Sequence, residues 1–200
     1  MSGPLHDLRV IDLSTVLAGP NCARYFADFG ADVIKIEKPG DGDSLRAMAW
    51  KDPRDGTGLW WKLVNRNKRN IALDLKVDAD REIFLRLIDE ANVLVENFRP
   101  GTLAKFALDH ASVSVSNPGV IITHVSGFGQ TGPRSSEAGF GSIGEAVGGI
   151  RHTTGDPDRP PARCGISLGD SLAAMFAVIG TLAALHERTT SGRGQEVDVA

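Results

Sequence analysis

Asp170 is the side chain in this sequence that is best placed for covalent chemistry. It lies in the turn 169–171, and the stretch 172–185 that follows contains no charged residue. This pattern predicts a helix that is buried on every face, with Asp170 at its N-cap. Two roles remain open for the carboxylate. It caps the helix by accepting hydrogen bonds from the amides of Leu172 or Ala173, or it is kept ionised by the helix dipole and attacks an acyl carbon.

Two further stretches have the composition of ligand-binding loops. Arg66, Lys68 and Arg69 are three cations in four residues, which favours a phosphate site, although a solvated turn is the commoner explanation for such a cluster. The loop 126–133 contains Gly127, Gly129 and a third glycine. A ligand can approach the backbone amides of such a loop closely, and ordinary turn chemistry explains the glycines equally well.

The elements that must position these residues alternate between strand and helix. Buried-type apolar runs predict strands, and apolar residues at helical spacing predict helices. We expect strands at 8–13, 31–37, 71–75, 91–95, 120–125 and 194–200, and helices at 21–29, 78–90, 102–106, 140–150 and 172–185. This alternation predicts an α/β fold with a Rossmann-like open parallel sheet flanked by helices.

Glu37 ends the second expected strand, where a dinucleotide-binding fold carries the acid that binds a ribose. The loop between the first strand and its helix reads TVLAGPN and lacks the spacing G-x-G-x-x-G. Without those glycines the phosphate cradle is missing, so an NAD site is not expected.

The overall composition is that of an ordinary soluble chain and argues against several classes of function. The 200 residues are 42% hydrophobic and 24% charged, which suits one core. A net charge of -3 gives no footprint for nucleic acid, and two cysteines favour a reducing compartment without a disulfide or zinc framework. No secretion signal is apparent, and the apolar run 172–185 is too short to cross a membrane. We therefore expect a cytoplasmic protein with no membrane contact.

Six motifs along the chain resemble, in their order, those of the family III CoA-transferases, which include formyl-CoA transferases and 2-methylacyl-CoA racemases. The motifs are VLAGP at 16–20, FGADVIKIEKPGDGD at 29–43, NRNKRNIALDLK at 65–76, VENFRPG at 95–101, VSGFGQTGP at 125–133, and SLGD followed by ALHERTTSGRGQEVD. The resemblance implies transfer of CoA between an acyl-CoA thioester and a free carboxylic acid. In such a reaction Asp170 attacks the thioester to give an acyl-aspartyl anhydride, and CoA thiolate then moves onto the aspartate.

The resemblance also implies which residues contact CoA, which is a substrate here and not a prosthetic group. They are Val16 and Ala18 where pantetheine enters, Lys38 and Lys76 at the phosphates, Leu73 and Asp74 beside the adenosine, Asn97 and Phe98 at the acyl end, and Lys105 as a weaker candidate. No metal is expected.

Gly127 and Gly129 are candidate donors to the oxyanion that forms when a thioester is attacked, because their loop exposes backbone amides. Arg163 lies close to Asp170 in sequence and is a candidate partner for the distal carboxylate of a dicarboxylic acid such as succinate. An ordinary surface role for Arg163 is an equal alternative.

Differences from the family motifs limit which substrates and which reaction we expect. Leu17 and Ser126 stand where formyl-CoA transferases carry Gln and Lys, which argues against formate or oxalate. Phe140 stands where the racemases carry a catalytic His, with His124 and His152 as the nearest substitutes. Racemisation is therefore the second candidate, and a CoA-binding subunit without transferase activity is the third.

The resemblance implies a protein that is longer than these 200 residues. Full members of the family have a second, smaller domain and a C-terminal segment that returns to the first, and two subunits interlock as a homodimer. Residues 1–200 correspond to the N-terminal part of the large CoA-binding domain, and the pattern at 194–200 stops in the middle of a strand. We expect the sequence to be truncated before the small domain.

Overall fold

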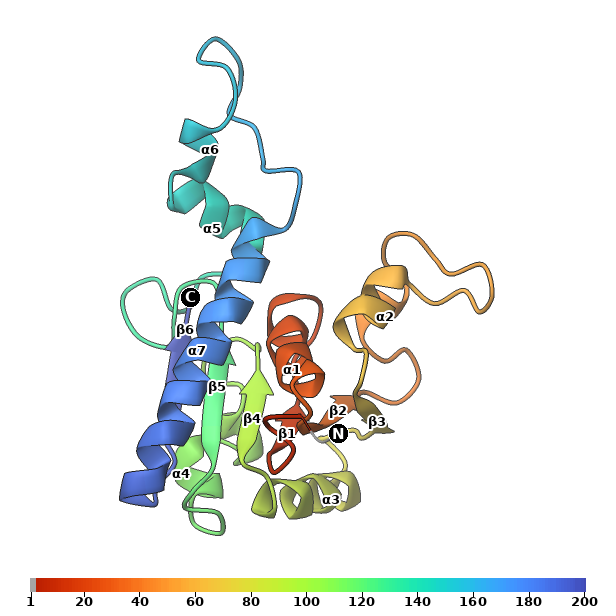
Figure 1. Ribbon diagram of the computed structural model, residues 1–200, viewed down its shortest axis with the longest axis vertical. Coiled ribbons are helices and arrows are strands. Elements are labelled where there is room, and N and C mark those ends of the chain that lie inside the picture. Colours follow the sequence, from red (N-terminus) through yellow and green to blue (C-terminus); the bar gives the residue numbers. More distant parts are fainter. Residues whose placement is uncertain (1–2) are drawn as a thin grey trace.

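The computed structural model describes residues 3–200 and contains a six-stranded sheet in which every neighbouring pair of strands is parallel (Figure 1). The strand order is β3-β2-β1-β4-β5-β6. The strands are β1 Arg9–Asp12, β2 Asp32–Glu37, β3 Arg69–Ala72, β4 Val93–Glu96, β5 Ile121–Val125 and β6 Glu196–Val199. The predicted α/β class and open parallel sheet are confirmed.

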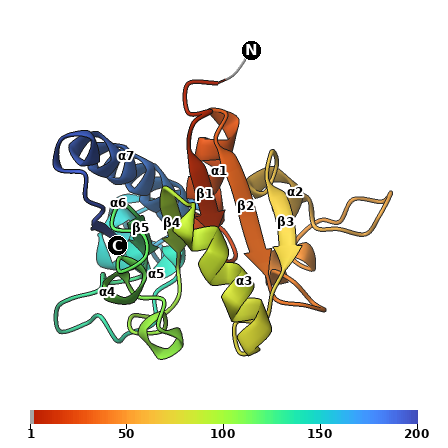
Figure 2. The ribbon, with the colours of Figure 1, turned by 90° about the horizontal axis from the view of Figure 1, so that it is seen from below.

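Helices cover both faces of the sheet (Figure 2). Alternate strand residues divide between two apolar clusters, as the pleat requires, with Val10 in one and Ile11 in the other. The cluster with Val10 includes α1 (Ala18–Asp28) and α7 (Leu168–Ser191), and the cluster with Ile11 includes α3 (Asp78–Asp89) and α4 (His110–Val113). The remaining helices are α2 Leu59–Val64, α5 Gly141–Val147, α6 Ile150–Thr153 and two 3-10 turns at Ser44–Arg46 and Ala104–Phe106.

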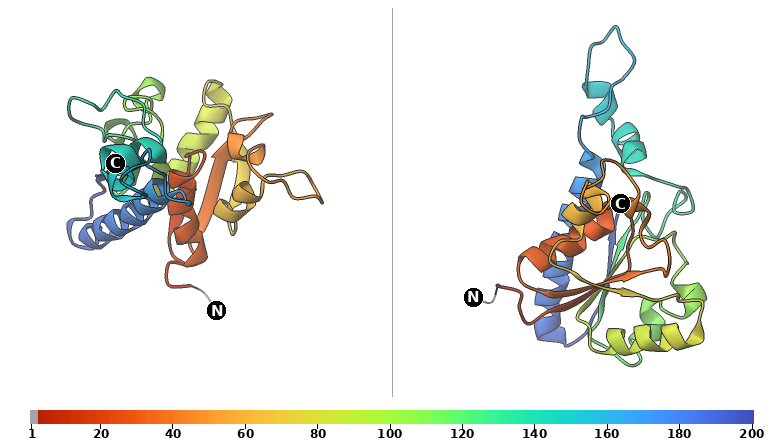
Figure 3. Two further views of the ribbon diagram at one scale, coloured as in Figure 1. Left: turned by 90° about the horizontal axis from the view of Figure 1, so that it is seen from above. Right: turned by 90° about the vertical axis from the view of Figure 1, so that its right-hand side faces the viewer.

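Strand order reverses between β1 and β4, which lie side by side at the centre of the sheet. From β1 the chain adds β2 and β3 on one side, and from β4 it adds β5 and β6 on the other. In open α/β sheets the crevice at the carboxyl ends of the two central strands is where ligands bind. The segment α5–α6 and the loop after it project beyond this end of the sheet (Figure 3).

The helix α7 differs from the expectation in length and in burial. It begins at Leu168 and contains 24 residues, and its most apolar 18 residues have a mean hydropathy of 1.8, enough by length and composition to cross a membrane. Its buried residues recur at helical spacing and form a single stripe against the sheet, as in a core helix: Ala174, Ala177, Val178, Thr181, Ala184 and Leu185. The opposite face is exposed at Leu172, Met175, Phe176 and Ile179, so the predicted burial on every side is wrong.

Other expected boundaries moved by a few residues. The strand expected at 71–75 is β3 at Arg69–Ala72, and the helix expected at 140–150 is broken into α5 and α6 around Gly149, whose φ is +82°. The helix α2 at Leu59–Val64 was not predicted, because its six residues are too few to display an apolar period.

Candidate active site

Two loops meet at the reversal point and are locked together by one side chain. The loop after β1 contains Thr15, whose amide donates to Asn97 Oδ1 at 2.8 Å, and Asn97 Nδ2 donates to the carbonyl of Thr15 at 2.7 Å. Asn97 follows β4 directly. The pair of hydrogen bonds therefore joins the carboxyl ends of β1 and β4.

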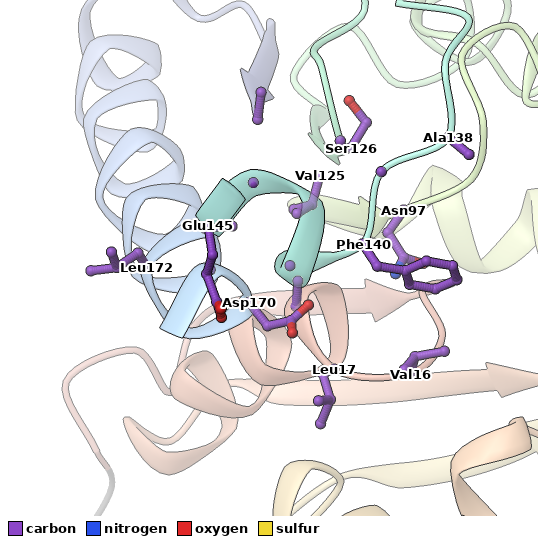
Figure 4. A pocket seen from close by; sticks show the side chains of 18 of the residues that line it. Val16, Leu17, Asn97, Val125, Ser126, Ala138, Phe140, Glu145, Asp170 and Leu172 are labelled. Carbon is purple, nitrogen blue, oxygen red and sulfur yellow. The ribbon is translucent and has the colours of Figure 1, made fainter. Parts of the chain in front are cut away.

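A cavity of about 480 Å³ opens beside this junction, and Asp170 lies in its wall (Figure 4). Its lining comes from the loops that follow β1, β4 and β5 (the β1, β4 and β5 loops), from α5 and from the first turn of α7. The lining residues include Val16, Leu17, Ala18, Asn97, Phe98, Ser126, Gly127, Phe140, Glu145 and Asp170. Of the residues named for catalysis, for the pantetheine entry and for the acyl end, the structure brings together Asp170, Gly127, Val16, Ala18, Asn97 and Phe98.

Asp170 is not the N-cap of α7. Ser167 occupies that position, Asp170 is the third helical residue, and no side chain makes a capping hydrogen bond at this end. The prediction of a capping role is wrong, because the helix starts earlier than the apolar run suggested. The carboxylate faces the cavity instead (Figure 4).

Glycines allow the segments around Asp170 to approach closely. A Cβ on Gly141 would lie 2.6 Å from Asp170 Oδ2, and a Cβ on Gly169 would lie 2.7 Å from the carbonyl oxygen of Gly141. A Cβ on Gly127 would lie 2.5 Å from the Cα of Gly139. A side chain at Gly141 or Gly169 would push α5 and the first turn of α7 apart, and one at Gly127 would push the β5 loop away from Gly139.

The electrostatic setting of Asp170 favours a basic carboxylate. Burial raises its pKa above the usual range, the guanidinium of Arg163 opposes that shift, and the charge of Glu145 adds to it. Glu145 is itself buried and accepts from Arg163 Nε at 3.3 Å, while Arg163 is about half exposed. The expectation that the helix end lowers the pKa of Asp170 is overturned, because burial is the larger influence.

A second cavity of about 270 Å³ lies against the first. Thr15 and Phe98 line both, and the second is also lined by Lys38, Leu73, Asp74 and Lys76. The residues named for the phosphates and the adenosine are therefore grouped together, on the β2 and β3 side of Asp170.

Glu37 lines the second cavity, but each of its carboxylate oxygens already has a partner from the protein. Its carboxylate accepts from Trp61 Nε1 at 2.9 Å and from Arg46 Nε at 2.7 Å, and the Arg46 guanidinium stacks 3.7 Å from the Trp61 ring centroid. One oxygen is held by Arg46 in the loop that follows β2 and the other by Trp61 in α2. The structure thus gives a second reason against a dinucleotide site.

Gly129 and Lys105 lie outside both cavity linings. The Gly129 amide donates to Ser126 Oγ at 3.0 Å, so it is not free to stabilise an oxyanion in this conformation. Lys105 is exposed on the 3-10 turn at Ala104–Phe106.

The cation cluster at 66–69 does not form a phosphate site, because each side chain is paired with a different acid. Arg66 contacts Asp28 at 2.6 Å and Arg69 contacts Asp32 at 2.6 Å. Lys68 is fully buried and contacts Asp12 at 2.8 Å. Arg66 lies in the turn at 65–67 and Arg69 lies in β3, so the three side chains reach different parts of the protein.

The two histidines considered for proton exchange lie away from Asp170. His124 is buried in β5 between Glu96 at 2.5 Å and Glu196 at 3.1 Å, and His152 is exposed on α6. Neither lines the cavity that contains Asp170. Among residues 3–200, no three His, Cys, Asp or Glu side chains are grouped so as to hold a metal ion.

Sequence reasoning did not identify Glu145 as part of this site. One signal was present, because Glu145 is the only charged residue between Glu137 and Arg151. A lone charge in a run of small and apolar residues has to find a partner when the run folds. Here the partner is Arg163.

Comparisons with known proteins all match one protein family. The model of CoA-transferase family III matches residues 5–200. The chain is 53% identical to the succinyl-CoA–D-citramalate CoA-transferase of Chloroflexus aurantiacus, over 98% of this chain and 48% of that protein. It is 43% identical to the succinyl-CoA:mesaconate CoA-transferase of Haloarcula hispanica, over 99% of this chain and 52% of that protein.

Solved structures give the same result. A CAIB/BAIF family protein from Brucella suis superposes with a TM-score of 0.95 at 37% identity, covering 100% of this chain and 53% of that one. A hypothetical protein from Mycobacterium tuberculosis superposes with a TM-score of 0.90 at 31% identity, covering 100% and 55%. The chain spans about half the length of the relatives it matches.

Proposed function

The chain belongs to CoA-transferase family III, and from this membership we propose that the protein transfers CoA between an acyl-CoA thioester and a free carboxylic acid. One observation carries the proposal. A partly buried carboxylate with a raised pKa, that of Asp170, lines a cavity that adjoins a second cavity lined by two lysines, Lys38 and Lys76. The two together match an acyl-CoA, which has a reactive thioester at one end and phosphates at the other.

In the proposed reaction, an oxygen of ionised Asp170 attacks the thioester carbonyl carbon, and the C–S bond breaks to release CoA thiolate. The product on the enzyme is an acyl-aspartyl anhydride. The thiolate then attacks the aspartyl carbonyl carbon, which releases the donor acid and leaves an aspartyl-CoA thioester. An acceptor carboxylate repeats the two steps in reverse and leaves as the new thioester, with Asp170 regenerated.

The side chains around Asp170 support these steps without a general base, because a carboxylate is already a nucleophile when it is ionised. The upward shift of its pKa makes the ionised carboxylate more basic. Gly127 is the loop glycine that lines this cavity, and we assign its amide to the oxyanion.

The names of the two relatives favour dicarboxylic acids as substrates, since both contain succinyl-CoA and a second dicarboxylic acid. Arg163 supports the same choice for this chain. Its guanidinium lies 3.3 Å from Glu145, which lines the Asp170 cavity, and we propose that it pairs with a distal carboxylate. We propose succinyl-CoA as the CoA donor.

Two other proposals concern the whole protein. The exposed apolar side chains of α7, Leu172, Met175, Phe176 and Ile179, support an interface with further chain or with a second copy, and we propose an interlocked homodimer. We also propose a cytoplasmic location, consistent with acyl-CoA substrates.

The test is peptide mass spectrometry after incubation with succinyl-CoA and with acetyl-CoA. Trypsin releases the peptide 164–188, which contains Asp170 and no internal Lys or Arg. We expect an acyl or CoA adduct on Asp170 from succinyl-CoA and none in Asp170→Asn. Calorimetric binding of CoA without any adduct from either thioester would contradict transfer and favour a non-catalytic CoA-binding subunit.

Racemisation makes a different prediction that the same sample can check. It would exchange the α-proton of a 2-methylacyl-CoA with deuterium from the solvent, without an adduct on Asp170. We expect no exchange, because the position of the racemase His is Phe140 and the cavity lining holds no histidine.

A further inference from the structure

Val16 has a backbone conformation that its side chain disfavours. Its φ is +66°, in the left-handed region, where a β-branched residue is an outlier. It sits in the β1 loop, between Thr15, which lines both cavities, and Leu17, which lines the first. Strain of this kind persists only where the surroundings hold it in place, and it is concentrated at functional sites.

Asp43 holds Val16 in this conformation. Both carboxylate oxygens of Asp43 lie 3.2 Å from the amide nitrogen of Val16, which donates to them. Asp43 Oδ1 also accepts from the amide of Leu45 at 3.0 Å, and the residue is 2% exposed. A buried carboxylate reaches across from the loop after β2 to fix the loop after β1.

Lys35 balances the charge of Asp43 and holds the same loop from its other end. Its ammonium group lies 3.3 Å from Asp43 Oδ2 and donates to the carbonyl oxygen of Ser14. Lys35 and Asp43 have no exposed side-chain surface. The carbonyl of Ser14 and the amide of Val16 flank Thr15, so the ion pair clamps the segment that separates the two cavities.

A second buried pair, Asp12 with Lys68, completes the cluster. Lys68 contacts Asp12 at 2.8 Å and donates to the carbonyl of Pro20 at 2.7 Å, and Lys35 lies 3.7 Å from Asp12. Two lysines and two aspartates therefore neutralise one another beneath the β1 loop. Such buried ion pairs are often no better for stability than apolar side chains of equal volume, so stability alone does not account for the cluster.

We propose that Asp43, supported by Lys35, is a positioning residue for CoA transfer. By holding Val16 in the left-handed region, it shapes the wall along which the pantetheine arm passes from the second cavity to the first, and so aligns the thioester with Asp170. This inference rests on the proposed function. It concerns the loop that guides the substrate and no group that reacts.

The test compares Asp43→Asn in three backgrounds of the intact protein: wild type, Val16→Gly and Val16→Ala. The Asn side chain keeps an acceptor for the Val16 amide but removes the charge that Lys35 balances. Glycine adopts a positive φ freely, whereas alanine removes the same side chain and still disfavours that conformation. The difference between the two backgrounds therefore isolates the backbone conformation of residue 16.

We expect Asp43→Asn to lower kcat by about tenfold to a hundredfold, because a small misplacement of the thioester is costly, while the Kd for CoA changes by less than about threefold. In the Val16→Gly background the same change should lower kcat by less than about threefold. In the Val16→Ala background the loss should remain as large as in wild type. Equal losses in all three backgrounds, or no loss in any, would overturn the proposal.

Thermal unfolding of each variant separates positioning from general damage. If Asp43→Asn merely weakens the fold, Val16→Gly will restore neither Tm nor kcat, and that pattern contradicts a positioning role. Hydrogen exchange of the peptide containing residues 14–18 gives a readout that needs no activity, and it should be faster in Asp43→Asn. An absent adduct on Asp170 in the wild-type protein would refute the transferase, whereas an adduct that forms at an unchanged rate in Asp43→Asn would refute only the clamp.

Discussion

The carboxylates of Asp170 and Glu145 enter the same cavity from two different helices, the first turn of α7 and the middle of α5 (Figure 4). The charge of Glu145 raises the pKa of Asp170, and Arg163, the ion-pair partner of Glu145, lowers it. Burial is the largest influence on the pKa of the proposed nucleophile, and these two neighbours adjust it in opposite directions.

The first prediction follows from the signs of these two influences. Glu145→Gln removes the anion, so the pKa of Asp170 falls and the acid limb of kcat/KM moves to lower pH. Arg163→Gln removes the cation, so the pKa rises and the acid limb moves to higher pH. Steady-state profiles of kcat/KM between pH 4 and 8 check both directions. If the acid limb moved in the same direction in both variants, the roles given to Glu145 and Arg163 would be contradicted.

The second prediction concerns Gly141. Alanine there would place its Cβ 2.6 Å from Asp170 Oδ2, so the carboxylate or α5 must shift, and we expect kcat to fall by about tenfold to a hundredfold. Gly144→Ala is the matched control, because it lies on the same helix and its Cβ would meet no atom within 4 Å. A wild-type kcat in Gly141→Ala would show that the position of Asp170 is not critical.

The third prediction concerns the lysines of the second cavity. Lys38→Ala and Lys76→Ala should each raise the Kd for CoA by about threefold to tenfold, since both side chains are exposed and their contacts with phosphate are screened by water. Lys105→Ala, outside both linings, is the control and should change the Kd by less than about twofold. Calorimetry with CoA and with pantetheine separates the cases, because pantetheine lacks the phosphates and its affinity should not respond.

The fourth prediction concerns stability and pH. Burial lowers the pKa of His124, but its hydrogen bonds with Glu96 and Glu196 outweigh burial and raise the pKa above 6.5. The imidazolium therefore stabilises the fold fully below pH 6.5, and this contribution is lost as the pH rises through the folded pKa. His124→Gln should cost about 2 kcal/mol in the free energy of unfolding at pH 5.5 and clearly less at pH 9. Denaturant titrations at the two pH values measure the difference, and an equal cost at both would contradict it.

The layout of the sheet could be predicted from the sequence because its signals are local. Apolar runs such as 31–37 and 120–125, each closed by a turn, mark strands that are buried on both faces, and the alternation with helices leaves few topologies. The start of α7 was misplaced because the helix begins at Leu168, four residues before the uncharged apolar run that marked it in the sequence.

The candidate site was only partly predictable, because its electrostatics depend on residues that are distant in sequence. The position of Asp170 could be argued from its turn, but its pKa depends on Glu145, which lies on another helix. In the same way, the cation cluster suggested a phosphate site because sequence alone does not show that Lys68 meets Asp12 inside the protein. Burial and partners decide the role of a charge, and neither is visible before folding.

The close contacts of Gly127 with Gly139, and of Gly141 with Gly169 and Asp170, also limit how this site can be re-engineered. A mutant library that aims to change the accepted acid gains nothing from these four glycines, since a side chain at any of them would collide with a neighbouring segment. Diversity belongs at positions whose side chains line the cavity without supporting its backbone, of which Leu17, Phe140 and Leu172 are three. The backbone that positions Asp170 would then stay unchanged, while the side chains that contact the acid are varied.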